Sequence, residues 1–295
     1  MSTKNNNLPA NTYTLQYHRT LQTVFGVEKA FANAFADLQI LDGIQENEIA
    51  FYVKTSDTPV VIREYNKGAN VGMGTGTAKS SRFGEITEIK YTTEPAEYDV
   101  ELASNDGFDI TTVNNNLEAA IADRLVAVAQ KQTYDLNVSN GEFISTVAGH
   151  TEQLADLSDE AVLALFNKLN AYYTDNQVIV PVTAYVRPDL YNAIVDHPLV
   201  TSGKGSAVNI DKNGILEFKE FRIKKEPSIY FKEDDAAYFI PDRVLIPFVG
   251  IVMARRVEPS DFAGSLLQTL SKAGKFILDD NKKAVVKVTS AAVEG

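Results

Sequence analysis

Histidine and cysteine, two residue types that often serve in catalytic and metal sites, are scarce in this sequence, which leaves few ways to build a His-based catalytic site. The 295 residues include three histidines, His18, His150 and His197, and no cysteine. The missing cysteines exclude disulfides, thiolate nucleophiles, zinc–thiolate sites and iron–sulfur clusters. No two histidines have the spacing that a metal site uses, and no serine lies in a Gly-x-Ser-x-Gly motif. The sequence therefore predicts no catalytic residue, no metal site and no cofactor.

Two other kinds of segment invite a chemical interpretation. Gly72–Ser80 is rich in glycine, as phosphate-binding loops are, but Ala78 stands where the Walker motif requires the glycine before its lysine. The acidic pairs Asp234–Asp235 and Asp279–Asp280 lack the alternating oxygen ligands of a calcium loop. We interpret the first segment as the tip of a loop and the two acidic pairs as solvated turns.

The composition is that of a globular protein with an acidic balance. Hydrophobic residues make up 44% and charged residues 23%, which argues against wholesale disorder. The 39 acidic and 28 basic residues give a formal charge of −11, a poor match to tightly bound nucleic acid. No apolar run approaches the about 18 residues of a membrane span. The N-terminus lacks the apolar core of a secretory signal.

The elements that would position any functional group begin with a polar, Asn-rich stretch over residues 1–12, which is typical of an extended arm. Four apolar residues then recur at spacings of four, four and three. This spacing predicts a helix between Leu15 and Ile40, ended by Asp42–Gly43. The residues of this apolar stripe are Val27, Phe31, Phe35 and Leu38.

A long two-stranded ribbon that extends from the rest of the chain is predicted next. Ile49, Phe51 and Val53 alternate with more polar residues, and Pro59–Ile62 resumes the extended pattern. After a polar, Gly-rich segment, Tyr98–Leu102 alternates apolar with acidic residues. A lone two-stranded ribbon is marginally stable in water. The predicted ribbon therefore needs a partner surface, and another subunit is one candidate.

Helical and then mixed α/β patterns follow. A stripe formed by Leu117, Ile121, Leu125 and Val128 predicts a helix over Asn116–Asn137, about 33 Å long, which Asn140–Gly141 ends. Ser158 is expected to cap a second helix, and Pro188 to begin a third over Arg187–Val195. Strands are expected at Val178–Val182, Phe218–Ile223, Ala237–Ile240, Val244–Arg256 and Ala284–Val288.

These parts favour a structural role over an enzymatic one. An arm, a ribbon, a long helix and a compact α/β region do not bury one shared core. Such a chain covers its remaining apolar surface against copies of itself.

The order of the parts resembles that of the major capsid protein of tailed bacteriophages, which has the Hong Kong 97-type fold. In their residue types and order, three stretches of the sequence also resemble capsid proteins of siphophages that infect low-GC Gram-positive bacteria. They are Ser80–Glu85 with Glu88–Tyr91, then Val113–Gln132, and then Ala254–Val257 with Asp261–Gly264, Leu267–Gln268 and Lys275. The resemblance covers most of the chain from residue 15 onward.

The resemblance implies an α+β fold with an N-terminal arm, an extension loop that is a β-hairpin, a peripheral domain with a long spine helix, and an axial α/β domain. The implied boundaries are 1–45 for the arm, 46–97 for the extension loop, 98–141 for the peripheral domain with its spine helix, 142–240 for the axial domain, and 241–295 for the return to the peripheral domain and the C-terminal strands.

The implied function is self-assembly into pentamers and hexamers that form an icosahedral shell around phage double-stranded DNA. The implied location is the virion, with assembly in the bacterial host cytoplasm. The implied partners are further copies of the chain, a portal protein, decoration proteins and a separate scaffolding protein, since the chain has no room for a scaffolding segment ahead of the arm. The DNA would be enclosed without tight binding. An encapsulin-like shell, which holds protein cargo, is the alternative function, and an enzyme is a third, poorly supported one.

Charged residues that bracket the extension loop are the candidates for contacts between subunits. They are Arg63, Glu64, Lys67, Lys79, Arg82 and Glu85. A solvated surface position is an equally good interpretation of each, because exposed ion pairs contribute little.

Overall fold

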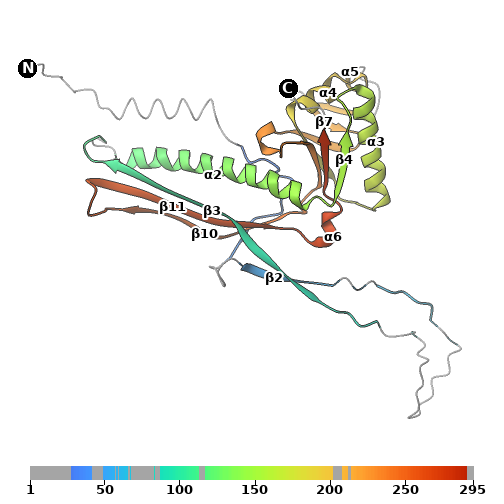
Figure 1. Ribbon diagram of the computed structural model, residues 1–295, viewed down its shortest axis with the longest axis horizontal. Helices are drawn as coiled ribbons and strands as arrows, with labels where there is room; N and C mark the ends of the chain where they lie inside the picture. The colour runs from blue at the N-terminus through green and yellow to red at the C-terminus, as the bar shows by residue number, and fades with distance from the viewer. Residues whose placement is uncertain are drawn as a thin grey trace, which may run out of the picture.

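The computed structural model describes residues 28–41, 49–56, 58, 60–65, 67, 83, 87–112, 117–201, 208–211 and 214–290. Their strands form a five-stranded sheet in the order β1-β10-β11-β3-β2 and a seven-stranded sheet in the order β4-β12-β9-β5-β8-β7-β6. Figure 1 shows the helix α2 lying along the first sheet, the second sheet with its helices at one end, and the β2–β3 ribbon projecting away from both.

The five-stranded sheet is organised around one unusually long strand. Its members are β1 (Gln39–Ile40), β2 (Ile49–Thr55), β3 (Thr92–Asp109), β10 (Ile246–Val257) and β11 (Gly264–Phe276). Residues 98–109 of β3 pair antiparallel with β11, and residues 92–97 pair antiparallel with β2. The predicted alternation is confirmed, because Ala96, Tyr98 and Val100 are buried while the residues between them are exposed. One strand thus belongs both to the sheet and to the projecting ribbon.

Helix α2 spans Leu117–Val147, or about 46 Å at 1.5 Å per residue. It is therefore ten residues longer at its C-terminal end than predicted. Asn140 and Gly141, expected to end the helix, are buried within it. A Cβ atom at Gly141 would lie 1.7 Å from the carbonyl oxygen of Tyr230. The glycine is there because the short helix η1 (Ser228–Tyr230) packs directly on α2.

The seven-stranded sheet carries the largest hydrophobic core. Its strands are β4 (His150–Leu154), β5 (Val182–Val186), β6 (Val208–Asp211), β7 (Gly214–Phe218), β8 (Phe221–Lys225), β9 (Asp235–Pro241) and β12 (Val286–Ser290). The remaining helices are α3 (Asp159–Asp175), α4 (Pro188–Asp196), α5 (Pro198–Thr201) and α6 (Asp279–Lys282). Phe166 of α3 lies in the core, where its ring centroid is 5.0 Å from that of Phe218 and 5.3 Å from that of Phe239. The predicted cap at Ser158 and helix start at Pro188 are both confirmed.

The helix predicted between residues 15 and 40 is wrong over its described part, residues 28–40, and residues 15–27 lie outside the described part. The backbone turns at Phe31, whose φ is 56°, and then runs extended into β1. Ala36 N–H donates to the carbonyl of Leu245 at 2.7 Å, and β1 pairs in parallel with β10. Phe31 and Phe35 are buried as their spacing suggested, but in a turn and a β-bridge.

Other strand predictions are shifted or divided. The strand expected at Val178–Val182 begins only at Val182. Gln177, whose backbone φ of 55° is in the left-handed region, lies in a turn that follows α3. Phe218–Ile223 is not one strand, because Lys219 and Glu220, both with positive φ, make the turn between β7 and β8. Strands β9, β10 and β12 occupy the predicted regions, whereas β4 and β11 were not predicted.

Candidate assembly surface

The base of the ribbon is held rigidly by aromatic packing. Phe51 of β2 meets Phe248 of β10 edge-on, with ring centroids 5.1 Å apart, and Tyr98 of β3 meets the same ring at 5.5 Å. Edge-to-face pairs of this kind contribute about 0.5–1.5 kcal/mol beyond their buried area. A Cβ atom at Gly274 would lie 2.4 Å from the Phe248 ring, so this ring packs directly over backbone. The ribbon therefore leaves the sheet in a defined direction.

Threonine contacts keep the two strands paired as they leave the sheet. The hydroxyls of Thr55 and Thr92 lie 3.1 Å apart, and that of Thr55 donates to Glu94 at 3.2 Å. Farther out, the amide of Lys90 donates to the hydroxyl of Thr58 at 3.2 Å. Beyond this point the described residues 60–65 belong to no strand of either sheet, and Pro59, the first residue of the extended pattern expected over Pro59–Ile62, lies outside the described residues.

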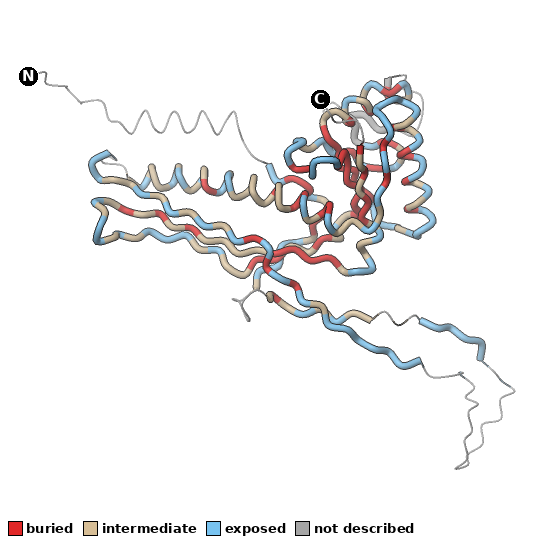
Figure 2. The backbone as a smooth tube through the Cα atoms, viewed as in Figure 1, coloured by how far each residue is buried: buried red, intermediate tan, exposed pale blue. Residues whose placement is uncertain are grey.

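The ribbon exposes many large apolar side chains. Among the described residues, eight of the seventeen exposed large apolar side chains lie between positions 52 and 91. They are Tyr52, Val60, Val61, Ile62, Tyr65, Phe83, Ile89 and Tyr91, which we call the ribbon apolar set. Val60 and Ile62 are 90% and 91% exposed. Figure 2 shows the same contrast, with buried segments in the sheets and pale blue along the ribbon.

Exposed apolar side chains gathered on one projecting ribbon favour a contact surface, because exposed apolar groupings on soluble proteins often mark interaction sites. Within the set, the rings of Tyr65 and Phe83 lie edge to face, with centroids 5.2 Å apart. Sequence reasoning did not select these residues. The available signal was a run of apolar residues, Val60–Ile62, beside a Gly-rich segment too polar to cover it.

The charged candidates fall into two groups. Arg63, Glu64 and Lys67 are exposed on the described part of the ribbon. Lys79, Arg82 and Glu85 lie outside the described residues, as does the glycine-rich stretch Gly72–Ser80. A role of the six residues in contacts between subunits stays a prediction.

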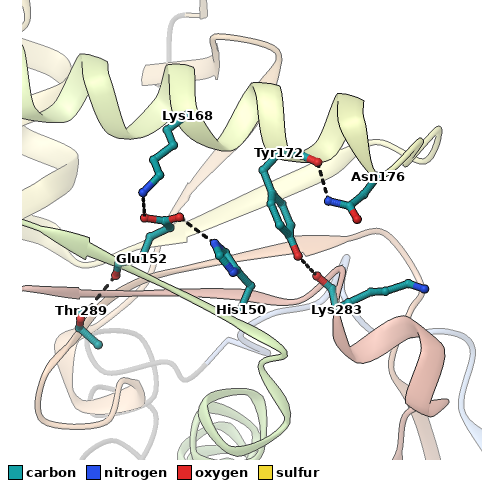
Figure 3. Close-up of polar contacts among 7 residues, drawn as sticks. All are labelled: His150, Glu152, Lys168, Tyr172, Asn176, Lys283 and Thr289. Atoms are coloured by element: carbon teal, nitrogen blue, oxygen red, sulfur yellow. Dashed lines mark hydrogen bonds and ion pairs between the residues drawn. The ribbon is translucent and has the colours of Figure 1, made fainter.

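A cluster of polar contacts lies elsewhere, between α3 and the edge of the seven-stranded sheet (Figure 3). Glu152 accepts from Lys168 at 2.6 Å through one carboxylate oxygen, and its other oxygen lies 2.7 Å from His150 Nε2. The imidazole stacks on Tyr172, with centroids 4.4 Å apart and planes at 13°. The Tyr172 hydroxyl donates to the carbonyl of Lys283 at 2.8 Å. These contacts hold the exposed side of α3 against β4 and the segment before β12.

The Glu152 carboxyl and the Tyr172 phenol of this cluster both have shifted pKa values. Burial raises the pKa of Glu152, but the hydrogen bonds from Lys168 and His150 outweigh it, so the pKa of this carboxyl is lowered. Burial, helped by the nearby Glu152, raises the pKa of the Tyr172 phenol. Near neutral pH the Glu152 carboxylate is therefore ionised and the Tyr172 phenol neutral, which suits a fixed contact between α3 and the sheet edge.

The other residues considered for chemistry also have structural roles. His197 is buried, and its Nδ1 accepts from the amide of Leu199 at 3.1 Å, while His18 lies outside the described residues. Asp235 is buried and accepts from the Tyr238 hydroxyl at 2.8 Å, so the prediction of a solvated turn is wrong for this residue. Within the part of the chain that the structure describes, no group of three or more acidic or histidine side chains could hold a metal ion. None of the described helices is long and apolar enough to cross a membrane.

Comparison with solved structures places this arrangement in a known fold. No protein-family model and no curated protein matches the sequence. The mature capsid of bacteriophage PhiM1 matches with a TM-score of 0.66 at 8% identity, over 91% of this chain and 89% of that one. The capsid of cyanophage P-SCSP1u matches with 0.64 at 12% identity, over 90% and 92% of the two chains. The capsid of Ralstonia phage GP4 matches with 0.54 at 11% identity, over 91% and 93%.

The chain has the Hong Kong 97-type capsid fold. The predicted α+β fold class is therefore confirmed. At these identities the likeness concerns the fold alone, and the chain matches almost the whole length of the phage capsid chains.

Proposed function

We propose that this chain is a major capsid protein of a tailed bacteriophage, which assembles into pentamers and hexamers and forms an icosahedral shell around double-stranded DNA. The observation that carries the proposal is the ribbon apolar set, displayed on a chain that has a capsid fold along nearly its whole length. Each such side chain, when covered by a neighbouring copy, contributes about 1.5–3 kcal/mol. Repeated around a ring of subunits, these contacts stabilise a closed shell without covalent links.

We assign the parts of the chain by the boundaries expected from the sequence. Residues 1–45 form the N-terminal arm, 46–97 the extension loop, 98–141 the peripheral domain with the spine helix, 142–240 the axial domain, and 241–295 the return to the peripheral domain and the C-terminal strands. The ribbon apolar set then belongs to the extension loop. Arg63, Glu64, Lys67, Lys79, Arg82 and Glu85 add charged contacts to neighbouring subunits.

The proposal includes the partners and location of such a shell. The chain associates with its own copies, a portal protein, a separate scaffolding protein and decoration proteins, in a siphophage of a low-GC Gram-positive host. It assembles in the host cytoplasm and resides in the virion. Its role is structural rather than enzymatic, and its acidic balance of −11 suits a container that must release its DNA.

Electron microscopy of the purified chain tests the assembly, first alone and then co-expressed with the proteins encoded beside it. We expect closed particles of uniform size with five- and six-fold clusters. A stable monodisperse monomer under both conditions would contradict the proposal. Nuclease-protected DNA in native particles then separates a phage shell from an encapsulin-like compartment, in which protein cargo would be found instead.

A further inference from the structure

A cavity of about 250 Å³ lies where α2, the five-stranded sheet and the first described residues of the chain meet. Leu136 of α2, Val100 and Ala273 of the sheet, and Phe35 and Leu38 contribute to its lining. An engineered apolar cavity of roughly 150 Å³ is large enough to bind a benzene ring. This cavity therefore has room for an aromatic side chain.

The polar groups in the cavity wall are already matched to each other. The ammonium of Lys275, whose side chain is 4% exposed, lies 2.9 Å from a carboxylate oxygen of Asp99 and donates to the hydroxyl of Ser139 at 2.6 Å. The buried cation and anion cancel, and the other charged lining residue, Lys29, is exposed to solvent, so the buried pair selects neither an anion nor a cation. The cavity suits a neutral apolar group.

The chain enters the described structure at the edge of this cavity. Asn137, which is 1% exposed, accepts from the amide of Ala30 at 3.0 Å and donates to the carbonyl of Glu28 at 2.8 Å. These two bonds fix the backbone of Glu28–Ala30 on α2. Asn137 and Lys29 both line the cavity. Residues 1–27, outside the described part, therefore join the structure at the cavity mouth.

We propose that the cavity is the docking site for the segment immediately before Glu28 of the same chain, with the ring of Phe25 inside it. Phe25 is four residues from Lys29, and four residues reach at most about 14 Å. It is also the only Phe, Tyr or Trp in residues 18–27, and Val24 and Val27 flank it with further apolar surface. Docking anchors the arm to α2 and sets where its first residues can extend.

Disulfide trapping tests this assignment. Because the chain has no native cysteine, only the introduced cysteines can form a disulfide. We expect the Val24→Cys/Leu136→Cys variant, which keeps the Phe25 ring, to form an intrachain disulfide in at least tenfold higher yield than the matched Val24→Cys/Val126→Cys variant. Val126 lies on the same helix but is 44% exposed. Mixing isotopically light and heavy chains distinguishes links within a chain from links between chains. Equal yields, or no link, would overturn the proposal, and predominantly interchain links would assign the cavity to the arm of a second copy instead.

A fluorescence variant gives an independent measurement if the cysteine pairs disturb folding. The chain has no tryptophan, so Phe25→Trp introduces a single reporter. We expect blue-shifted emission and weak acrylamide quenching, compared with a solvent-like spectrum for Gln22→Trp. Solvent-like emission from both variants would contradict docking. Both experiments work on dissociated subunits, so their result is separate from whether the chain forms a shell.

Discussion

Phe166 and Tyr65 are aromatic residues in two regions of the molecule. The two regions differ in how far the chain itself covers their apolar side chains. Phe166, in the seven-stranded sheet, is fully buried and meets the rings of Phe218, Phe221 and Phe239. Tyr65, on the ribbon, meets Phe83 and remains 48% exposed. The first region completes its core within one chain, whereas the second displays apolar surface that a neighbour can cover. Substitutions in the two regions should therefore affect different steps, folding in one and assembly in the other.

The largest expected effect is on folding. Phe166→Ala removes the ring at the centre of the core and should lower the free energy of unfolding by about 3–5 kcal/mol. Thermal or denaturant unfolding of the dissociated subunit measures this loss. Val252→Ala, at a position 78% exposed, is the control and should change stability little. If both variants unfold alike, the seven-stranded region is not the independent core described above.

The next largest effect is on assembly. Ile62→Ser/Tyr65→Ser removes two members of the ribbon apolar set, and we expect the concentration needed for assembly to rise at least tenfold, because about 1.4 kcal/mol corresponds to tenfold. The unfolding midpoint of the subunit should stay unchanged. Light scattering against protein concentration provides the measurement.

Ile179→Ser is the matched control for this prediction, because Ile179 is 97% exposed but lies outside the ribbon. If it impairs assembly as strongly as the ribbon variant, general loss of apolar surface is responsible, and the ribbon has no special role.

A smaller effect is expected from the polar contact of α3 with the sheet edge. Because the pKa of Glu152 is lowered below its ordinary value of 4.5 in the folded state, its stabilising contribution is present above that pH. The contribution is lost as the pH falls through the lowered pKa. Glu152→Gln should therefore be less stable at pH 7 and lose less stability on acidification than the parent chain.

Unfolding curves between pH 7 and pH 3 test this difference, with Glu160→Gln, at an exposed position of α3, as control. Parallel pH profiles for Glu152→Gln and the parent chain would show that the Lys168–Glu152–His150 contact contributes nothing to stability.

The smallest effect is expected from the charged residues of the ribbon. Arg63→Ala/Lys67→Ala should weaken each subunit contact by at most about 1 kcal/mol, because exposed ion pairs are weak. The loss should shrink further at high salt, which screens exposed charges. Assembly assays at low and high ionic strength measure it. A large, salt-independent loss would mean that these side chains act through buried contacts instead.

Local patterns predicted several elements well. The Ser158 cap of α3, the start of α4 at Pro188 and the alternation in β3 follow from the side chains themselves. The end of α2 did not, because Asn140–Gly141 is a common stop signal that here accommodates the backbone of a distant segment. Strand β11 was missed because it lies between two neighbours and under α2, so its residues do not alternate simply between apolar and polar.

The sequence by itself determined the absence of cysteine chemistry, the apolar alternation of the ribbon strands and the resemblance that predicted the fold, since each depends on residue types and their order. Only the tertiary structure decided that residues 28–41 run as a turn and a strand rather than a helix, because pairing with β10 replaces helical hydrogen bonds. It also decided which apolar residues stay exposed. Phe35 and Ile62 are similar in a hydrophobicity pattern, yet only Phe35 has other parts of its own chain packed over it.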